Sequence, residues 1–214
     1  MTRGKSSGTR AEKTRQTRRR MVAAARDLFV ERGYAATTLQ DVADRAGVAV
    51  QTIYFTFGNK RALLKELADV TVAGDEEPIA TMDRAWFRDA LVAPTAAAQI
   101  RALTRGARDI LDRIAPIASV LRTAAILDAE VADLWGHDPD PRYTVYHTAT
   151  QALVTKPGIR DDVTAEHAAD VLFALLSPEL YVLLVNDRGW TADRWEQWVD
   201  TTLRAQLLMD TTSN

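Results

Sequence analysis

Basic side chains gather in the N-terminal third of the chain, and their chemistry is the binding of a polyanion. Residues 1–66 hold 14 Lys and Arg but only 6 Asp and Glu, a net charge of +8. The remaining residues hold 13 basic and 23 acidic side chains, a net charge of −10. A basic end on an acidic body predicts a polyanionic partner at one end only. The alternative is a basic tail that is simply solvated.

Part of this charge lies at the very start of the chain. Residues 1–13, MTRGKSSGTRAEK, are rich in Gly, Ser, Thr and basic side chains, so we expect a disordered basic tail. Contacts from such side chains to phosphate add affinity but little sequence specificity. The side chains that can follow a phosphate backbone or enter a minor groove are Arg10, Lys13, Arg15, Arg18, Arg19 and Arg20.

The segment that could recognise a nucleotide sequence is residues 37–57, TTLQDVADRAGVAVQTIYFTF. The first half has helical spacing, and Thr38 and Asp41 are placed as a capping box. Gly47 ends this helix. The second half is rich in β-branched and aromatic residues, but a strand there has no neighbour to pair with. We therefore predict a second short helix.

Two short helices joined by a glycine turn form a helix-turn-helix. Ala43 is small enough for close packing, Gly47 makes the turn, and Ile53 reaches the shared core. The second helix can then enter the major groove with its outward residues on base edges. We assign Phe55 and Phe57 to the core rather than to the groove.

This segment resembles the N-terminal region of the TetR (tetracycline-repressor) family of transcriptional regulators, over about residues 20–65. Ala49 departs from the family pattern, which usually has Ser or Thr as a helix cap, and the missing cap costs ~1 kcal/mol. The matching pieces are Gly33-Tyr34, Thr37-Thr38, Ala46-Gly47-Val48, Thr52-Ile53-Tyr54, Phe57 and Lys60.

The resemblance implies five DNA-binding residues. Gln51 occupies a position that meets bases, and its amide can pair bidentately with adenine. Thr52 and Tyr54 match positions that touch phosphate or the groove floor. Lys60 adds charge near the start of the next helix, and Thr38 offers its hydroxyl to phosphate. The alternatives are structural: surface threonines, a packed aromatic ring and a solvated lysine.

Beyond Gly74 the sequence predicts only helices, interrupted by prolines. The predicted fold is all-α, with a helix-turn-helix DNA-binding domain of three helices in residues 14–65. Residues 66–214 form a helical bundle for ligand binding and dimerisation. The helices expected in this second domain lie near 80–91, 95–114, 117–127, 129–136, 142–155, 164–187 and 191–209.

The resemblance implies two roles for the second domain. The last two helices pair with those of a second copy, so that a homodimer reads a palindromic operator with half-sites ~34 Å apart; the alternative is that they close an intramolecular core. The middle helices hold an apolar cavity for an unidentified small-molecule effector. Candidate lining residues are Trp86, Phe87, Leu103, Arg122, Trp135, Tyr143, Tyr146 and His147, with plain core packing as the alternative.

Other side chains lack the spacing for catalysis or metal binding. His137, His147 and His167 are scattered, and none is at i, i+4 from another. The sequence has no nucleophile elbow, phosphate loop or dinucleotide motif, so we expect no enzyme, no cofactor and no metal site. It has no cysteine and hence no disulfide. We find no secretory h-region and no uncharged apolar run near ~18 residues, and expect no membrane span.

These observations predict a cytoplasmic, homodimeric, ligand-responsive DNA-binding regulator that acts as a repressor on double-stranded DNA. The alternative from another class is an all-α module that sequesters an apolar metabolite and uses the helix-turn-helix only for packing. A third possibility, a small enzyme, needs a site that the sequence does not contain.

Overall fold

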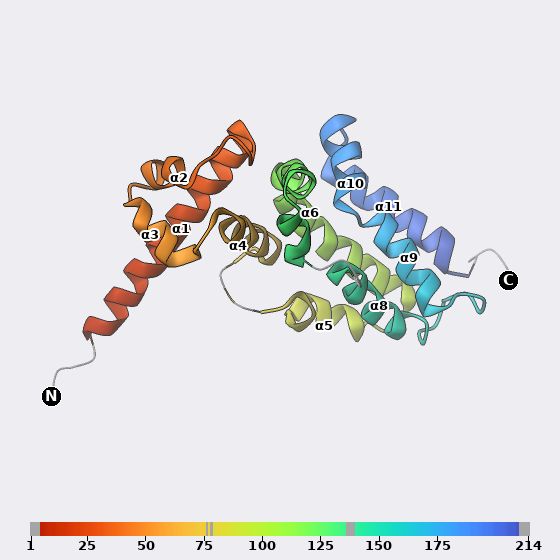
Figure 1. The fold of residues 1–214 in the computed structure, drawn as a ribbon. Coiled ribbons are helices and arrows are strands. Elements are labelled where there is room, and N and C mark those ends of the chain that lie inside the picture. The colour runs from red at the N-terminus through yellow and green to blue at the C-terminus, as the bar shows by residue number, and fades with distance from the viewer. Residues whose placement is uncertain (1–4, 76, 78, 136–139, 210–214) are drawn as a thin grey trace. The chain divides into compact units, whose positions relative to one another are not determined.

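The computed structural model describes residues 5–75, 77, 79–135 and 140–209, and these residues are almost entirely helices and connecting loops (Figure 1). Within them the β-structure is limited to an isolated bridge between Ile159 and Leu208. The predicted all-α class is confirmed. The chain divides into two compact units: Met1–Val70 with Ser119–Leu134, and Thr71–Ala118 with Trp135–Asn214.

The first unit is built on a long first helix. Its core combines Phe29 of the first helix with Val42, Ile53 and Leu64 from the three that follow, and each of these side chains is fully buried. The segment Ser119–Leu134 also belongs to this unit, although the sequence analysis places it in the second domain. The helices are α1 (Lys5–Arg32), α2 (Leu39–Ala46), α3 (Val50–Phe57), α4 (Lys60–Ala73) and α7 (Ala129–Ala132), with the end of α6.

Helix α1 begins at Lys5, earlier than the sequence analysis expects. Within the exposed stretch 10–16 of this helix, Arg15 Nη2 lies 2.6 Å from Glu12 Oε2. Ion pairs three residues apart favour a helix, which explains how a polar segment is ordered without a core. The helix ends before Gly33, whose φ of 82° is the left-handed conformation expected after a helix end.

The second unit is a bundle around a core that includes Phe87, Ile100, Leu172 and Trp195. Threonine and serine side chains cap its helices; Thr191, for example, accepts a hydrogen bond from the backbone of Arg194. Its elements are the short helix η1 (Thr81–Asp83), α5 (Ala85–Leu91), most of α6 (Ala96–Leu127), α8 (Pro141–Leu153), α9 (Ala165–Leu175), α10 (Pro178–Tyr181), the π-helix η3 (Val182–Asp187) and α11 (Ala192–Leu207).

The prediction of two separate helices over 95–114 and 117–127 is wrong. Helix α6 runs without a break from Ala96 to Leu127 and contains Pro116. The proline removes one backbone hydrogen bond, but its neighbours Ala115 and Ile117 are both buried. Their burial offsets the loss because packing supplies most of the stability of a helix in a folded protein.

The helix expected over 164–187 is not continuous. Helix α9 ends at Leu175, and α10 begins at Pro178 with Ser177 as its cap. The predicted helix over 129–136 is also shorter, since α7 covers only Ala129–Ala132 and passes into the 3₁₀ turn η2 (Asp133–Trp135).

One run of described residues, Ala165–Asp187, is long and apolar enough to cross a membrane by length and composition alone. Its apolar window has a mean hydropathy of 1.8, and 28% of that window is buried. Core helices of water-soluble proteins pass the same test, and here the run is interrupted at Ser177 and Pro178. The large apolar side chain that stays open to solvent in this run is that of Leu183, which is 50% exposed.

Candidate nucleic-acid interface

Helix α2 is held at both ends by the signals that its sequence contains. The backbone N–H of Asp41 donates to Thr38 Oγ1 at 3.1 Å, and the backbone N–H of Thr38 donates to Asp41 Oδ2 at 2.8 Å. The hydrogen bonds from Thr38 hold the pKa of the Asp41 carboxyl below its usual range. At the other end Gly47 has a φ of 66°, and its N–H reaches the carbonyls of Ala43 and Asp44. The predicted capping box and turn are confirmed.

Helix α3 is the second helix of the predicted helix-turn-helix. It begins after Ala49, whose extended backbone suits a cap but whose side chain provides no cap hydrogen bond. Ile53 is fully buried and fixes the helix to the core, as the sequence predicts. Gln51 is exposed on the same helix, and Tyr54 is 53% exposed.

The assignment of Phe55 to the core is wrong, because its side chain is 94% exposed. A signal for this was present: residues two apart on a helix do not share a face, and Ile53 faces the core. Phe57 is half-buried, and the guanidinium carbon of Arg18 lies 4.9 Å from the centre of its ring. Phe55 therefore joins Gln51 and Tyr54 as a side chain that α3 presents to its surroundings.

Lys60 lies at the start of α4 in a partly buried setting. Its Nζ donates to the carbonyls of Tyr34 at 2.8 Å and Thr37 at 2.9 Å, and it lies 4.2 Å from the centre of the Tyr34 ring. Burial lowers the pKa of this ammonium. Lys60 thus clamps the loop between α1 and α2, and a phosphate contact would have to share the ammonium with these carbonyls.

The two threonines also have structural partners. The Thr38 hydroxyl donates to Asp41 Oδ2 at 2.5 Å, so its cap role occupies its proton. Thr52 is half-buried, and its carbonyl accepts a hydrogen bond from the Thr56 hydroxyl at 2.7 Å. Of the five predicted DNA-binding residues, Gln51, Tyr54 and Thr38 are exposed, and Thr38 uses its hydroxyl in the helix cap. DNA contact by all five remains a prediction.

The first unit also carries exposed basic residues outside α3. Arg10, Lys13 and Arg20 of α1 are exposed. Arg45 is neutralised by a two-point ion pair with Glu31, at 3.1 and 3.0 Å. The positive charge that a polyanion meets in this unit comes mainly from α1 and not from α2.

The second unit contains an apolar cavity of about 120 Å³. Four of the predicted effector-site residues line it: Trp86, Phe87, Leu103 and Tyr146. The other lining residues are mostly aliphatic and come mainly from α6, α8 and the α9–α10 junction, with Val72 of α4 and Thr81 of η1; they include Leu111, Ile114, Val145 and Leu176.

Arg142 is a lining residue that the sequence analysis does not identify. Its Nη2 lies 3.0 Å from Asp140 Oδ2, and its guanidinium carbon lies 4.8 Å from the centre of the Phe173 ring. Tyr146 donates its hydroxyl to the carbonyl of Leu176 at 3.2 Å, and burial raises the pKa of this phenol to about 12. The cavity is thus apolar with one cation and one neutral phenol at its wall.

The remaining predicted effector residues lie elsewhere. Tyr143 and His147 stack with ring centres 6.1 Å apart and are not among the residues that line the cavity. Arg122 is exposed and belongs to the first unit. The side chain of Trp135 lies outside the described residues, and so does His137, which is one of the three scattered histidines and not an effector candidate. The structure therefore groups half of the eight candidates.

Comparison with known proteins supports the resemblance found in the sequence. Residues 21–67 match the family model described as bacterial regulatory proteins, tetR family. Over 58 residues the chain is 43% identical to the HTH-type transcriptional regulator TtgR of Pseudomonas putida. That match covers 27% of this chain and 28% of the relative's length.

Solved structures extend the likeness to the whole chain. A TetR-family transcriptional regulator from Syntrophomonas wolfei has a TM-score of 0.72 at 17% identity, covering 94% of this chain and all of that one. A transcriptional regulator from Saccharomonospora viridis in complex with choline has a TM-score of 0.67 at 18% identity, covering 91% and 98%. Residues 21–67 are thus similar in sequence to the bacterial tetR-family regulators, and the likeness of the full chain to the solved TetR-family structures is one of fold. The predicted family resemblance is confirmed.

Proposed function

We propose that the chain is a ligand-responsive transcriptional repressor that binds a palindromic DNA operator as a homodimer in the cytoplasm. The observation that carries the proposal is the orientation of α3. Ile53 is fully buried, while Gln51, Tyr54 and the 94% exposed Phe55 project from the same short helix. A helix used only for packing has no reason to expose two aromatic rings and an amide.

The contacts expected from these residues differ in kind. The Gln51 amide suits the N6 and N7 edge of adenine, and the Phe55 ring suits the methyl group of thymine. Tyr54 and the exposed basic residues of α1 suit phosphate. Contacts to phosphate would position the helix-turn-helix on the duplex without specifying the DNA sequence. The operator half-site should therefore contain A·T pairs at the centre of the footprint of α3.

Dimerisation would bring the helix-turn-helix units of two copies onto one face of the duplex. The surface of the second unit supports it, because Leu183 is 50% exposed and Trp198 is 37% exposed. Trp198 also packs edge-on against Trp190, with ring centres 5.8 Å apart. Large apolar side chains grouped in this way are typical of a protein interface, and a second copy of the chain is the partner we propose.

The cavity in the second unit is the proposed effector site. Its volume of about 120 Å³ is below the ~300–1,000 Å³ usual for small-molecule sites, so an effector must widen it. Widening could couple effector binding to DNA binding, because ligand binding shifts the equilibrium toward the conformation with the larger cavity. The choline complex of the similar structure supports a small organic effector in this fold, without identifying the effector here.

The test is a binding measurement on DNA. Purified protein should shift a fragment that carries a palindrome from its own promoter region, with affinity that falls steeply as salt rises. Gln51→Ala combined with Tyr54→Ala should abolish the specific shift, while Gln206→Ala, an exposed glutamine on α11, should leave it unchanged. If the double variant binds as well as the wild type, a module that only sequesters a metabolite becomes the better interpretation.

A further inference from the structure

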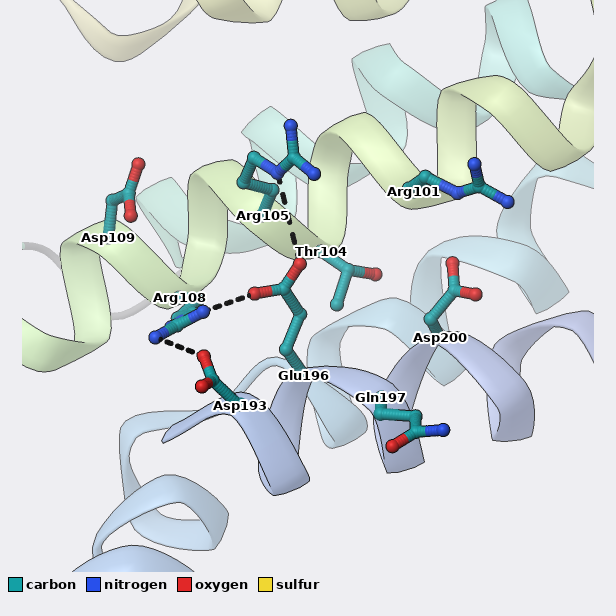
Figure 2. Close-up of a pocket in the computed structure, with 9 residues that line it drawn as sticks. All are labelled: Arg101, Thr104, Arg105, Arg108, Asp109, Asp193, Glu196, Gln197 and Asp200. Atoms are coloured by element: carbon teal, nitrogen blue, oxygen red, sulfur yellow. Dashed lines mark hydrogen bonds and ion pairs between the residues drawn. The ribbon is translucent and has the colours of Figure 1, made fainter. Parts of the chain in front are cut away.

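A second pocket in the second unit differs in character from the apolar cavity. It has a volume of about 520 Å³, lies between α6 and α11, and shares no lining residue with the cavity. Figure 2 shows three arginines and one carboxylate, Asp109, on the α6 side of this space, and three carboxylates with no basic residue among the labelled side chains of the α11 side, so the net charges of the two sides are opposite. The pocket therefore has walls of opposite charge.

One end of the pocket is closed by ion pairs between the two helices. Arg108 of α6 lies 2.7 Å from Glu196 Oε2 and 2.7 Å from Asp193 Oδ1 of α11. The hydrogen bond to Glu196 raises the pKa of the Arg108 guanidinium. These three side chains form ion pairs with one another and link α6 to α11 at this end. The open part of the pocket therefore lies beyond them.

The floor of the open part has two buried oxygens without partners. Thr104 is 1% exposed, and its Oγ1 has no hydrogen-bond partner among the described residues. Asp200 Oδ2 accepts from Arg204 Nε at 2.7 Å, but its buried Oδ1 has no partner in the same set. A threonine inside a helix commonly donates back to the carbonyl four residues earlier, whereas Figure 2 shows Thr104 reaching from α6 toward α11.

The rim of the same part offers positive charge. Arg101 is exposed, and within the described part of the chain it forms no ion pair; Figure 2 shows it on α6 across from Asp200. Arg105 is also exposed, and its Nε is 3.9 Å from Glu196 Oε1, too long for a hydrogen bond. Acceptors at the floor and guanidinium groups at the rim call for a ligand with donors at one end and an anion at the other.

We propose that this pocket binds a small zwitterion of the free α-amino acid class. The ammonium group has three N–H donors, enough for Thr104 Oγ1 and Asp200 Oδ1 together. The carboxylate suits the planar fork of Arg101. A simple anion would leave the two floor oxygens without a hydrogen-bond donor. A simple cation would leave the guanidinium groups at the rim without an anionic partner. This site is separate from DNA binding and from the cavity proposed for the effector.

The first measurement is calorimetry on the full-length protein with each of the twenty common L-amino acids. At least one should bind, and blocking either end of the best binder should weaken it about tenfold or more, since each blocked form loses a charged hydrogen-bonding group. The blocked forms are the N-acetyl derivative and the carboxamide. If none of the twenty gives heat or a thermal shift, the proposal is overturned, and ordered water is the better occupant of the floor.

Variants then place the ligand. Thr104→Val keeps the shape of the side chain but removes the hydroxyl, and Arg101→Gln removes the rim charge; each should lower affinity about tenfold or more. Thr104→Ser should retain binding, and Arg88→Gln, an exposed arginine on α5, is the matched control. Because Arg101 is exposed, its variant tests the site even if a substitution of Thr104 prevents folding. Unchanged affinity in both Thr104→Val and Arg101→Gln would rule the pocket out.

Discussion

Arg61 in the first turn of α4 holds Asp128 at the start of α7, with Arg61 Nε 2.7 Å from Asp128 Oδ2. The same guanidinium reaches Glu130 Oε2 at 2.6 Å through Nη1. Asp128 in turn caps α7 by accepting from the backbone N–H of Glu130. One arginine therefore ties the helix that follows the helix-turn-helix to a segment far along the chain, within the first unit.

Replacing Arg61 with Gln should make stability less dependent on pH in the acid range. The hydrogen bond from Arg61 lowers the pKa of Asp128. A carboxyl with a lowered pKa contributes stability above its unfolded-state pKa of about 4 and loses it as pH falls through the folded-state value. Thermal unfolding should thus separate wild type from Arg61→Gln at neutral pH and bring them together near pH 2. Curves separated equally at both pH values would contradict this role.

Replacing Ala49 with Ser should stabilise the first unit. Ala49 has the backbone conformation of a helix cap, with φ −70° and ψ 142°, but provides no side-chain hydrogen bond. A serine hydroxyl at such a position can accept from the backbone of the first turn and contributes about 1 kcal/mol. Chemical denaturation should show the gain, and Ala49→Val, which adds a side chain without a hydroxyl, should not. Equal stability of Ala49→Ser and wild type would mean that this helix end is already satisfied by water.

The helix-turn-helix was predictable because most of its signals are local. The cap pair Thr38 and Asp41 and the glycine at 47 each act within a few residues of their partners, and the buried Ile53 was indicated by its apolar type and helical spacing. The all-α class followed because no run of residues had a strand partner. The prediction of a helix break at Pro116 was wrong, because a proline in the sequence indicates a lost backbone hydrogen bond but not the packing that compensates for it.

The pockets were less predictable because they depend on the register between distant helices. Thr104 and Asp200 lie far apart in the sequence, and nothing near either residue indicates the other. Trp86, Phe87, Leu103 and Tyr146 were found by type alone, since aromatic and aliphatic residues line most cavities. The same reasoning selected Tyr143 and His147, which pack on each other instead.

Replacing Phe55 with Ala should separate DNA binding from stability. Its side chain is 94% exposed, so truncation removes almost no buried surface, and the free energy of unfolding should change by no more than ~0.5 kcal/mol. Loss of the apolar contact between Phe55 and a thymine methyl group should weaken operator binding severalfold. Denaturation and fluorescence anisotropy on one protein batch check both expectations, with Val92→Ala, another exposed apolar residue, as the control. If Phe55→Ala lowered stability strongly but left operator affinity unchanged, Phe55 would be a core residue and not a DNA contact.

Replacing Gly106 with Ala should disturb the wall of the apolar cavity. A Cβ at Gly106 would lie 2.3 Å from Cζ3 of Trp86, so the indole ring must move. Alanine normally gains up to ~1 kcal/mol over glycine inside a helix, but overpacking costs ~1–3 kcal/mol, and we expect the second effect to exceed the first. The free energy of unfolding should fall in Gly106→Ala and recover when Trp86→Leu is added, which a double-mutant cycle measures. Additive effects of the two substitutions would show that the ring and the glycine are not coupled.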